Sequence, residues 1–574
     1  MLATYTPPRF EYVRSRDQSA ATPPHYPVII VGAGPVGLAA AIDFSQHGVK
    51  TVLLDDDNTV SVGSRAVCHA KRTLEILDRL GCGEPVVERG ISWNLGKVFF
   101  KDRLIYTFNL LAEEGHRRPA FVNLQQYYFE EILLGRLRSL GHTDLRWMSK
   151  VVSVATEREG VKLGVETPDG PYALTCNWLL VADGARSPVR HMMGLESKGQ
   201  VFRDRFLIAD VVMKADFPTE RWFWFDPPFH RNQSTLLHRQ ADNVWRIDFQ
   251  LGWDRDPEEE KKPERVIPRI QAMLGDDREF ELEWVSVYTF QCRRMDTFRY
   301  GRVLFAGDAA HQVSPFGARG ANSGVQDVDN LVWKLALVLE GKAPERLLDT
   351  YSDERVGAAD ENILNSTRST DFIAPKARVS RIFRDATLEL AEKHPFARKL
   401  VNSGRLSVPA TLRTSPLNTP DVPRDQFHGS MVPGAPAADA PITRDGIPGW
   451  FLDLIGNRFD GLLFAPSERF VAPDAADLAA LAREAIPVRT LIVVPNGRGI
   501  SVVPEGCEVV EDTVGWLDKR YDSRPGTFYL LRPDQHVAAR WRRFEASSVR
   551  AAVQRATCGD LGRSDHVPLA AHAA

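Results

Sequence analysis

Three short motifs in this sequence combine residue types that hold a phosphorylated cofactor, and the first is a glycine-rich turn. Gly32, Gly34 and Gly37 form G-x-G-x-x-G between an expected strand and an expected helix that begins near Pro35. Gly32 permits a tight turn, Gly34 lets a pyrophosphate approach the backbone, and Gly37 lets helix and strand pack closely. Asp55, at the end of the next expected strand, can accept hydrogen bonds from ribose hydroxyls. The motif predicts a dinucleotide site without separating FAD from NAD, and a glycine turn without a ligand is the alternative.

The other two motifs place a carboxylate at the end of an expected strand. In residues 307–311 (GDAAH), Asp308 is followed by small residues and can accept hydrogen bonds from the ribityl hydroxyls of a flavin. In residues 182–187 (ADGARS), Asp183 and Gly184 precede an expected helix. Taken singly, each motif is also explained by an ordinary turn or by a strand–turn–helix junction.

The elements that must position these motifs follow from the pattern of apolar residues. Short apolar runs at 28–31 and 51–54, on either side of a helical stretch, indicate a βαβ unit with parallel strands. Alternating residues over 145–174 indicate antiparallel strands, and the Trp-, Phe- and Val-rich region 206–290 indicates a mixed sheet that covers a substrate. Another buried strand at 302–306 leads into a long helix with one apolar face. The prediction is an α/β chain with all three motifs at strand ends.

Length and composition restrict the class of protein. The chain has 574 residues, 43% of them apolar and 26% charged, with a formal net charge of -3. Two or three globular domains are expected, and nothing favours a nucleic acid or a membrane as partner. The six cysteines are scattered without metal-ligand spacing, so we predict reduced thiols and no metal site. We expect a cytoplasmic protein, because no apolar leader and no spanning segment is evident.

The last third of the chain has a different composition. Eight prolines between Pro409 and Pro448 indicate a linker or an extended wrapping segment. Beyond them, apolar runs at 461–465, 490–494 and 527–531 alternate with an alanine-rich helical stretch. This pattern predicts a small C-terminal α/β domain.

In this order and spacing, the three motifs resemble the class A flavoprotein aromatic hydroxylases, which share the para-hydroxybenzoate hydroxylase fold. The resemblance covers about residues 27–400 and is greatest to the longer phenol hydroxylases, such as 3-(3-hydroxyphenyl)propionate hydroxylase. These carry a C-terminal thioredoxin-like domain, which residues 449–464 and 531–540 match. No CxxC motif accompanies that match, so we expect the domain to be structural.

The resemblance implies an α/β fold with a Rossmann-like FAD-binding domain, an interleaved mixed-sheet substrate domain and a C-terminal thioredoxin-like domain. The implied segments are a flexible N-terminus (1–25), the FAD-binding domain (26–400) with the inserted sheet (about 90–125 and 200–295), a Pro-rich linker (401–448), the thioredoxin-like domain (449–560) and a tail (561–574).

The resemblance also implies which residues hold the cofactor. Arg65 would approach it, and Gln125 would lie near the FAD. In the loop whose backbone meets the flavin ring, Ala318 and Arg319 replace the commoner Gly and Gln, which would alter the mobility of the ring or the polarity around the substrate. The full set of implied cofactor residues is Gly32, Gly34, Pro35, Gly37, Asp55, Arg65, Gln125, Asp183, Gly184, Asp308, Pro315, Gly320, Ala321 and Asn322.

The implied function is that of an FAD-dependent monooxygenase, which uses NAD(P)H and O2 to hydroxylate a small aromatic, phenolic substrate through a C4a-hydroperoxyflavin. NADH and NADPH are not distinguished, and the resemblance is compatible with a homodimer. No catalytic side chain is assigned, because each candidate is also explained by packing in the expected sheet. The candidates in that sheet are Trp222, Phe223, Trp224, His238, Arg239, Arg246 and Tyr288. His311 is expected to be structural.

Three other functions remain open. A hydroxylase of a polyketide or an N-heterocycle would carry the same three motifs. A flavin-dependent halogenase would carry a W-x-W-x-I-P box, which residues 222–227 resemble except that Asp226 replaces the isoleucine. A flavin-binding protein without catalysis is the third alternative.

Overall fold

The computed structural model describes residues 4–252, 254–275, 278–401, 406–465, 472–497, 500 and 503–559. The chain divides into two compact units, one formed by Met1–Asp329 with Arg355–Pro409 and the other by Asn330–Glu354 with Ala410–Ala574. The expected tail (561–574) lies outside the described residues. The predicted mixed α/β fold class is confirmed.

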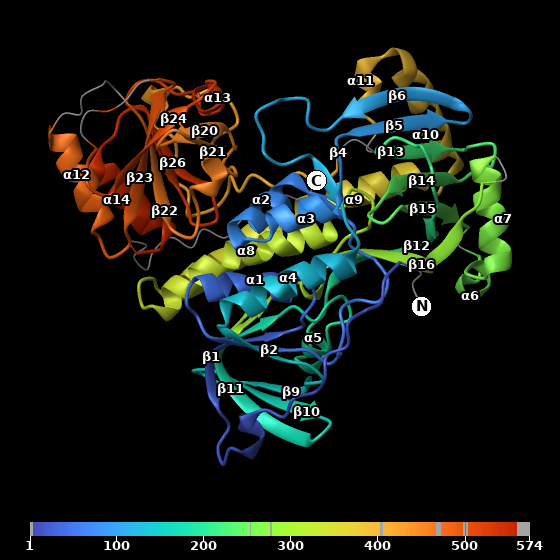
Figure 1. Cartoon of the computed structure of the whole chain (residues 1–574), viewed down its shortest axis with the longest axis horizontal. Helices are drawn as coiled ribbons and strands as arrows, with labels where there is room; N and C mark the ends of the chain where they lie inside the picture. Colours follow the sequence, from blue (N-terminus) through green and yellow to red (C-terminus); the bar gives the residue numbers. More distant parts are fainter. Residues whose placement is uncertain are drawn as a thin grey trace. The chain divides into compact units, whose positions relative to one another are not determined.

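The first sheet of the first unit includes the three strands that run into the motifs, β1 (His25–Val31), β11 (Gly170–Val181) and β18 (Val303–Phe305) (Figure 1). Its other strands are β2 (Thr51–Leu54), β8 (Thr143–Arg146), β9 (Lys150–Thr156), β10 (Val161–Thr167) and β17 (Arg299–Tyr300). Strands β18, β11, β1, β2 and β8 are parallel neighbours in that order, so their carboxyl ends lie at one edge. Strand β11 differs from expectation, because its first half pairs antiparallel with β10 and its second half pairs in parallel with β1.

Helices cover this sheet and begin at its carboxyl edge. Helix α1 (Pro35–Gln46) follows β1 directly and has proline at a position where the missing N–H costs nothing. It lies beside α4 (Gln126–Leu140) on one face of the sheet (Figure 1). Further helices of this unit are α2 (Lys71–Leu80), α3 (Gly83–Arg89), α5 (Pro188–Met192), α10 (Arg378–Lys393) and α11 (Pro395–Arg398), together with the first half of α8 (Gly320–Leu339) and most of α9 (Asp349–Ile373). A small sheet of β3 (Cys68–Ala70), β7 (Phe121–Asn123) and β4 (Ile91–Trp93) lies among them.

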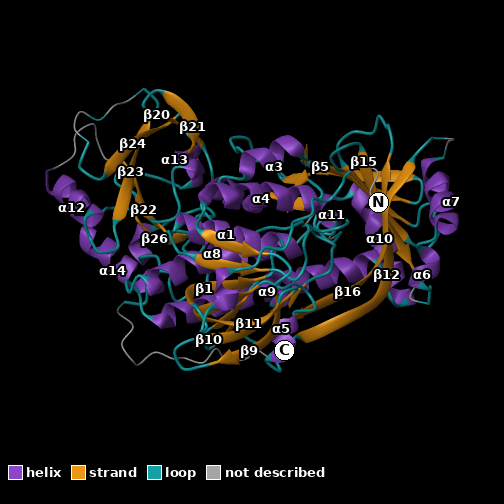
Figure 2. Cartoon of the chain, turned by 60° about the horizontal axis from the view of Figure 1, so that its bottom comes forward, coloured by secondary structure: helices purple, strands orange, loops and turns teal. Residues whose placement is uncertain are grey.

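The second sheet of this unit is almost entirely antiparallel. In spatial order its strands are β19 (His311–Gln312), β16 (Glu281–Arg294), β12 (Lys198–Val212), β15 (Val244–Leu251), β14 (Ser234–Arg239), β13 (Arg221–Phe225), β5 (Leu95–Phe100) and β6 (Arg103–Asn109). The long strands β12 and β16 pair side by side (Figure 2). One face of the sheet packs apolar side chains such as Trp245 against Val266 and Ile270 of α7 (Pro263–Leu274), beside the short α6 (Pro257–Glu260). Because side chains alternate along a strand, the next residues face the opposite side, toward the cavity described below.

The second unit contains a seven-stranded mixed sheet with an apolar core on each face. Its strands and helices are β20 (Pro441–Arg444), β21 (Ile447–Trp450), β22 (Phe459–Phe464), α12 (Ala472–Ala482), β23 (Val488–Pro495), β24 (Cys507–Asp512), α13 (Trp516–Arg520), β25 (Phe528–Leu531), β26 (Val537–Trp541) and α14 (Ala546–Ala556). The Pro-rich segment is extended and hydrogen-bonded to this sheet, since Thr419 N donates to Ala538 O (2.9 Å) and Gly434 N to Val537 O (2.7 Å). It is therefore a wrapping segment, the second of the two predicted alternatives.

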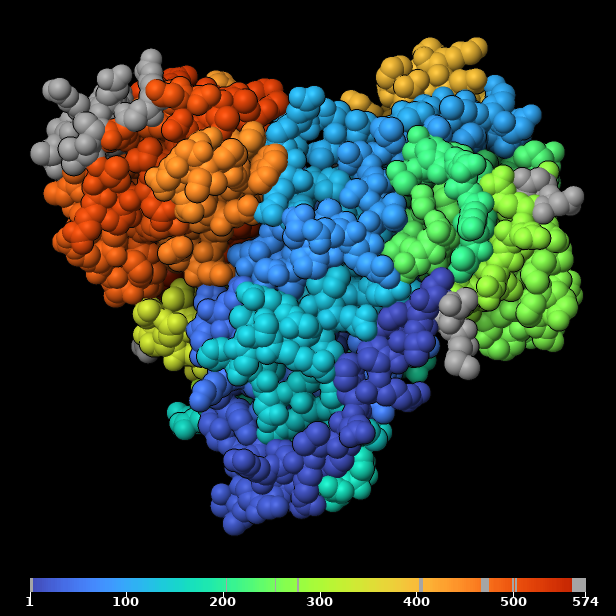
Figure 3. Space-filling view, in the orientation of Figure 1, coloured from blue at the N-terminus to red at the C-terminus, as the bar shows by residue number. Residues whose placement is uncertain are grey.

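The N-terminal residues differ from the flexible segment that was expected. The Thr4 hydroxyl donates to Glu283 at 2.6 Å, and Asp17 accepts hydrogen bonds from Tyr26 and Arg146. Figure 3 shows the start of the chain, in dark blue, lying along the surface of the first unit.

The described residues contain neither a membrane-spanning helix nor a metal-binding cluster. Among the described residues, no helix is long and apolar enough to cross a membrane. In the same part of the chain, no three histidine, cysteine, aspartate or glutamate side chains gather where they could hold a metal ion.

Candidate active site

A cavity of about 890 Å³ lies where the carboxyl edge of the first sheet meets one face of the second sheet. This is near the upper end of the range for small-molecule sites, roughly 300–1,000 Å³. Twelve of the fourteen residues predicted to hold the cofactor line it; they are Gly32, Gly34, Pro35, Asp55, Arg65, Asp183, Gly184, Asp308, Pro315, Gly320, Ala321 and Asn322. Gly37 and Gln125 do not line it.

Two glycines of the turn, Gly32 and Gly34, border the cavity, and two, Gly32 and Gly37, allow close packing of the backbone. Gly32 has φ +102°, and a Cβ there would come within 2.5 Å of the Ala182 carbonyl oxygen. A Cβ on Gly37 would lie 1.8 Å from the Gly32 carbonyl oxygen, so this glycine lets α1 pack on the turn and does not itself reach the cavity. A Cβ on Gly34 would meet nothing within 4 Å, and this residue borders the cavity.

Asp55 is held at the edge of the cavity by two backbone N–H groups. Its Oδ2 accepts a hydrogen bond from Ala33 N at 2.5 Å and its Oδ1 accepts one from Asp57 N at 2.9 Å. Burial raises the pKa of the carboxyl to about 6, although these two hydrogen bonds favour the ionised form. The carboxylate is thus fixed in place, with further lone pairs for hydroxyl donors.

We expect the affinity for FAD to fall as the pH is lowered through about 6. The ribose hydroxyls would donate to Asp55, and the ionised carboxylate is the better acceptor, so FAD binding would lower the pKa of Asp55. By linkage the affinity is then lost as the pH falls, by at most about tenfold for each pH unit below that value. Fluorescence titration of FAD on either side of pH 6 measures this change. The Asp55→Asn variant should bind FAD more weakly and without this pH dependence; an unchanged pH profile in that variant would contradict the role of Asp55.

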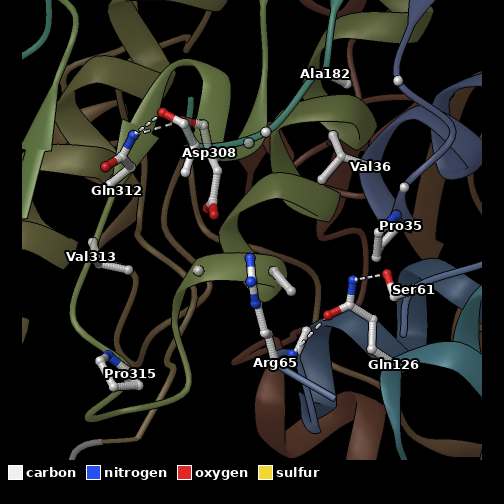
Figure 4. A pocket seen from close by; sticks show the side chains of 18 of the residues that line it. Pro35, Val36, Ser61, Arg65, Gln126, Ala182, Asp308, Gln312, Val313 and Pro315 are labelled. Carbon is white, nitrogen blue, oxygen red and sulfur yellow. Dashed lines mark hydrogen bonds between the residues drawn. The ribbon is translucent and has the colours of Figure 1, made fainter. Parts of the chain in front are cut away.

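Asp308 and Arg65 extend into the same part of the cavity (Figure 4). Burial raises the pKa of Asp308, while the nearby charges of His311 and Arg65 lower it. Burial also raises the pKa of Asp183, whose Oδ2 accepts a hydrogen bond from Val189 N at 3.0 Å. Both carboxyl groups lie at the ends of parallel strands, as the motifs predicted.

The cavity is lined by Gln126 and not by the predicted Gln125. Gln126 lines the cavity, accepts a hydrogen bond from Ala66 N (3.0 Å) and donates to the Ser61 hydroxyl (2.8 Å), as Figure 4 shows. Gln125 is the cap residue of α4, and its side chain turns away to donate to the Ala241 carbonyl. One signal in the sequence could have indicated Gln126. It stands four residues before Glu130, and on a helix this spacing brings the two side chains together, as the hydrogen bond from Gln126 to Glu130 shows.

Helix α8 begins at the cavity wall with Gly320 and Ala321, where its first N–H groups lack partners within the helix. The Asn322 side chain is hydrogen-bonded to the backbone of β3: it accepts from Ala70 N and donates to Cys68 O, both at 2.8 Å. Ala318 adopts φ +51°, a left-handed conformation that glycine adopts without strain. Arg319 is buried and donates to the Phe316 carbonyl at 3.3 Å.

His311 positions the GDAAH loop. Its Nε2 lies 2.6 Å from Asp327 Oδ2, which also accepts a hydrogen bond from Gly307 N at 2.9 Å. Arg355 donates to the other oxygen of Asp327 at 2.7 Å. All these groups are buried, so the histidine holds the loop to α8.

The far end of the cavity is a polar face of the second sheet. Strand alternation and register bring Arg221, His238, Arg246, Asp248 and Tyr288 to this face. The sequence had indicated three of these five; Arg221 and Asp248 were missed. Apolar neighbours from the same face and the α8 loop complete this end: Phe206, Ile208, Phe290 and Phe316.

Four of the sheet residues considered as substrate neighbours do not line the cavity, and one of them, Phe223, lies in an apolar cluster with Phe225. Arg239 donates to Asn243, next to the turn between β14 and β15. Trp222 and Trp224 pack with the apolar cluster on the outer face of the sheet. The other three do not line the cavity, because each is one residue out of phase with the inward positions.

A cavity of this kind, at the carboxyl edge of a parallel sheet and beside a glycine turn, defines a Rossmann-type dinucleotide-binding protein. Residues 25–366 match the FAD binding domain family. The chain therefore belongs to this family, that of the FAD-dependent aromatic monooxygenases; it is an oxidoreductase, and FAD is its cofactor.

The chain is similar over nearly its whole length to several characterised proteins. A 6-methylpretetramide 4-monooxygenase from Streptomyces rimosus is 30% identical over 560 residues, covering 92% of this chain and 93% of that protein. A 3-(3-hydroxy-phenyl)propionate/3-hydroxycinnamic acid hydroxylase from Mycolicibacterium smegmatis is 26% identical, covering 89% and 90%. The crystal structure of the flavin-dependent monooxygenase PieE, in complex with FAD and substrate, superposes with a TM-score of 0.78 at 22% identity, covering 94% of this chain and 100% of that one.

Proposed function

We propose that the protein hydroxylates a phenolic aromatic compound, using FAD, NAD(P)H and O2. The observation that carries this proposal is that the residues predicted to hold FAD and the polar face of the second sheet line the same cavity. An aromatic ring held at that face could be oriented toward a cofactor in the same cavity. Bound FAD would supply hydride acceptance and oxygen activation, while the protein supplies binding and orientation.

The residues of this cavity fit FAD. Gly34 and the first turn of α1 leave room and free N–H groups for a pyrophosphate. Asp55 offers lone pairs to ribose hydroxyls, and Asp308 offers them to ribityl hydroxyls. The start of α8 presents the positive end of a long helix, which would stabilise negative charge on the pyrimidine end of a reduced flavin.

A second cavity, of about 750 Å³, supports NAD(P)H as the co-substrate. It shares Ala185, Arg186, Gln291 and Gln312 with the first cavity and lies next to the Asp183–Gly184 motif. Its lining includes further cationic or titratable side chains, which suit the phosphates of a nicotinamide dinucleotide: Arg190, His191 and Arg293.

A polycyclic polyketide with phenolic rings is the second candidate substrate. It is favoured by the first relative described above, a 6-methylpretetramide 4-monooxygenase that matches this chain along its whole length. The tryptophan pattern no longer favours halogenation, because Trp222 and Trp224 lie on the outer face of the sheet and do not line the cavity.

A visible spectrum of the purified protein, followed by NADH and NADPH oxidation with and without phenols, tests the proposal. We expect bound FAD and a strong increase in oxidation rate with at least one simple or polycyclic phenol, accompanied by a hydroxylated product. FAD binding without stimulation by any phenol would favour a flavin-binding protein without catalysis or a heterocyclic substrate. A protein that binds no FAD would overturn the proposal.

A further inference from the structure

The polar face at the far end of the cavity is built from five adjacent strands. Strand pairing places His238 directly opposite Arg246, and Arg246 opposite Asp210. Asp248 lies two residues beyond Arg246 on the same face. Because Trp222 pairs with Leu237, the residue before Trp222, which is Arg221, lies next to His238 on this face. The positions of these charged groups are thus set by backbone register.

Several polar atoms in this cluster have no partner within the described protein. They are both ring nitrogens of His238, Oδ1 of Asp248, Nε of Arg221 and the hydroxyl of Tyr288. Buried polar atoms are almost always hydrogen-bonded, so a cluster of orphans beside a cavity points to a polar group of a bound molecule. Arg246 differs, because it is paired with Asp210 at 2.8 Å and also donates to the Ser64 carbonyl.

The charges of the cluster indicate the kind of group. Arg221 and Arg246 are cationic, Asp210 and Asp248 are acidic, and these four charges cancel when both carboxyls are ionised. Burial and the two neighbouring guanidinium groups hold the pKa of His238 well below its ordinary value, so this histidine is neutral. Arg65, which lies over the Tyr288 ring, is a further cation nearby, but a substrate carboxylate bound among these groups would still face the carboxylate of Asp248. A hydroxyl group suits the site better, because it can donate to the carboxylate and accept from Arg221 or His238.

We infer that this face binds the hydroxyl of a neutral phenol, with Arg221 and His238 holding its oxygen and Asp248 accepting its proton. In this step the O–H bond of the phenol breaks and an O–H bond to the Asp248 carboxylate forms, with no change of oxidation state. The resulting phenolate has a more electron-rich ring, which favours attack on an electrophilic oxygen. The inference rests on the proposed function and adds two things to it. The first is the substrate class, a phenol that has no carboxylate at this end, and the second is a catalytic base, Asp248.

The surroundings of Asp248 suit it to this role. Burial raises its pKa to about 6, while Arg246 and Arg221 lower it and Asp210 raises it further. A base with a raised pKa is better matched to a phenol, whose pKa is near 10. His238 from β14 and Tyr288 from β16 complete the groups that face it, and burial raises the pKa of Tyr288, so both are neutral near pH 7.

The test uses the FAD-loaded protein and measures binding and turnover of an accepted phenol on either side of pH 6. A carboxylate must be ionised to accept the proton, so kcat of the wild type should fall as the pH is lowered through about 6. Asp248→Asn should still bind the phenol but should lack this pH dependence, because an amide oxygen accepts a hydrogen bond without taking the proton. In turnover with an accepted phenol, Asp248→Asn should lower kcat by roughly 10²–10⁴-fold. Arg221→Gln should mainly raise KM.

The matched control is Arg239→Gln, a sheet arginine that does not line the cavity; it should leave the pH profile, kcat and KM unchanged. A second comparison replaces the phenol by para-hydroxybenzoate, which should bind at least tenfold more weakly than phenol.

Three results would overturn the inference: a wild type that binds no phenol or whose kcat does not fall as the pH is lowered through about 6, an Asp248→Asn variant that keeps this pH dependence, or tighter binding of the carboxylate. The pH profile of the wild type decides the matter even if the variant fails to fold. A protein without bound FAD would instead remove the proposed function on which the inference rests.

Discussion

Replacing Gly34 by alanine is expected to weaken FAD binding on the order of a hundredfold and to leave the FAD-free protein within about 1 kcal/mol of its original stability. A Cβ at this position meets no atom within 4 Å, and φ is -76°, so alanine fits the backbone. It would, however, extend beside the cavity at the first turn of α1, where a pyrophosphate must approach the N–H groups. Fluorescence titration with FAD and thermal unfolding of the FAD-free protein measure the two quantities.

The matched variant is Gly37→Ala, for which the main loss should be in stability. Its Cβ would lie 1.8 Å from the carbonyl oxygen of Gly32, and a backbone atom cannot move aside as a flexible side chain can. Overpacking of this kind typically costs about 1–3 kcal/mol, and we expect at least that loss in the FAD-free protein. Equal losses of stability in the two variants would contradict the division of roles between the two glycines.

Replacing Glu354 by glutamine is expected to destabilise the protein by about 3–5 kcal/mol, because it leaves the buried Lys334 without its carboxylate partner and leaves Arg532 with Asp534 alone. Glu354 accepts hydrogen bonds from Arg532 (2.6 Å) and Lys334 (2.7 Å), and all three side chains are at most 1% exposed. The two cations hold the pKa of the Glu354 carboxyl well below its usual range, although burial opposes them. Its contribution to stability is therefore present at neutral pH and is lost as the pH falls through the acid range. Chemical denaturation at several pH values measures both effects.

The control is Glu505→Gln, which breaks the exposed pair of Glu505 with Arg483 and should cost no more than about 1 kcal/mol. Lys334 supplies a second check. Burial lowers its pKa to about 8 even with Glu354 present. Without that carboxylate its pKa should fall further, so part of the lost stability should return as the pH rises toward the alkaline range. A variant whose deficit is independent of pH would contradict the assignment of the loss to this cluster.

The motifs at the strand ends could be predicted because their requirements are local. A glycine with φ +102° beside a neighbouring backbone, or an aspartate after a buried strand, is evident within a few residues of sequence. The same reasoning was wrong by one residue at Gln125, because the first residues of a helix point in different directions. Only the position of the helix cap, which depends on tertiary packing, separates Gln125 from Gln126.

The polar face of the second sheet could not be found by composition, because buried charged residues resemble surface ones in a sequence. A turn signal was nevertheless present. Asp242 and Asn243 have φ of 59° and 57°, in the left-handed region that tight hairpin turns use. A plain two-residue loop there would pair His238 with Ile247, whereas the structure pairs His238 with Arg246, so the turn locates the hairpin and its register is one residue different. Arg221 comes from a strand with a separate, longer connection, and its register could not be deduced in this way.

The second unit is assembled from two stretches of chain that are separated in sequence by Arg355–Pro409. A protein ending near Pro409 would keep Trp333, Lys334 and Glu354 and would lose the residues that cover and neutralise them, such as Phe459 and Arg532. Deleting the C-terminal third would thus expose an apolar and partly ionised helix end, and we expect such a truncated protein to aggregate. In sequence order the molecule is not modular, and domain deletion is the wrong experiment for asking what its C-terminal part does.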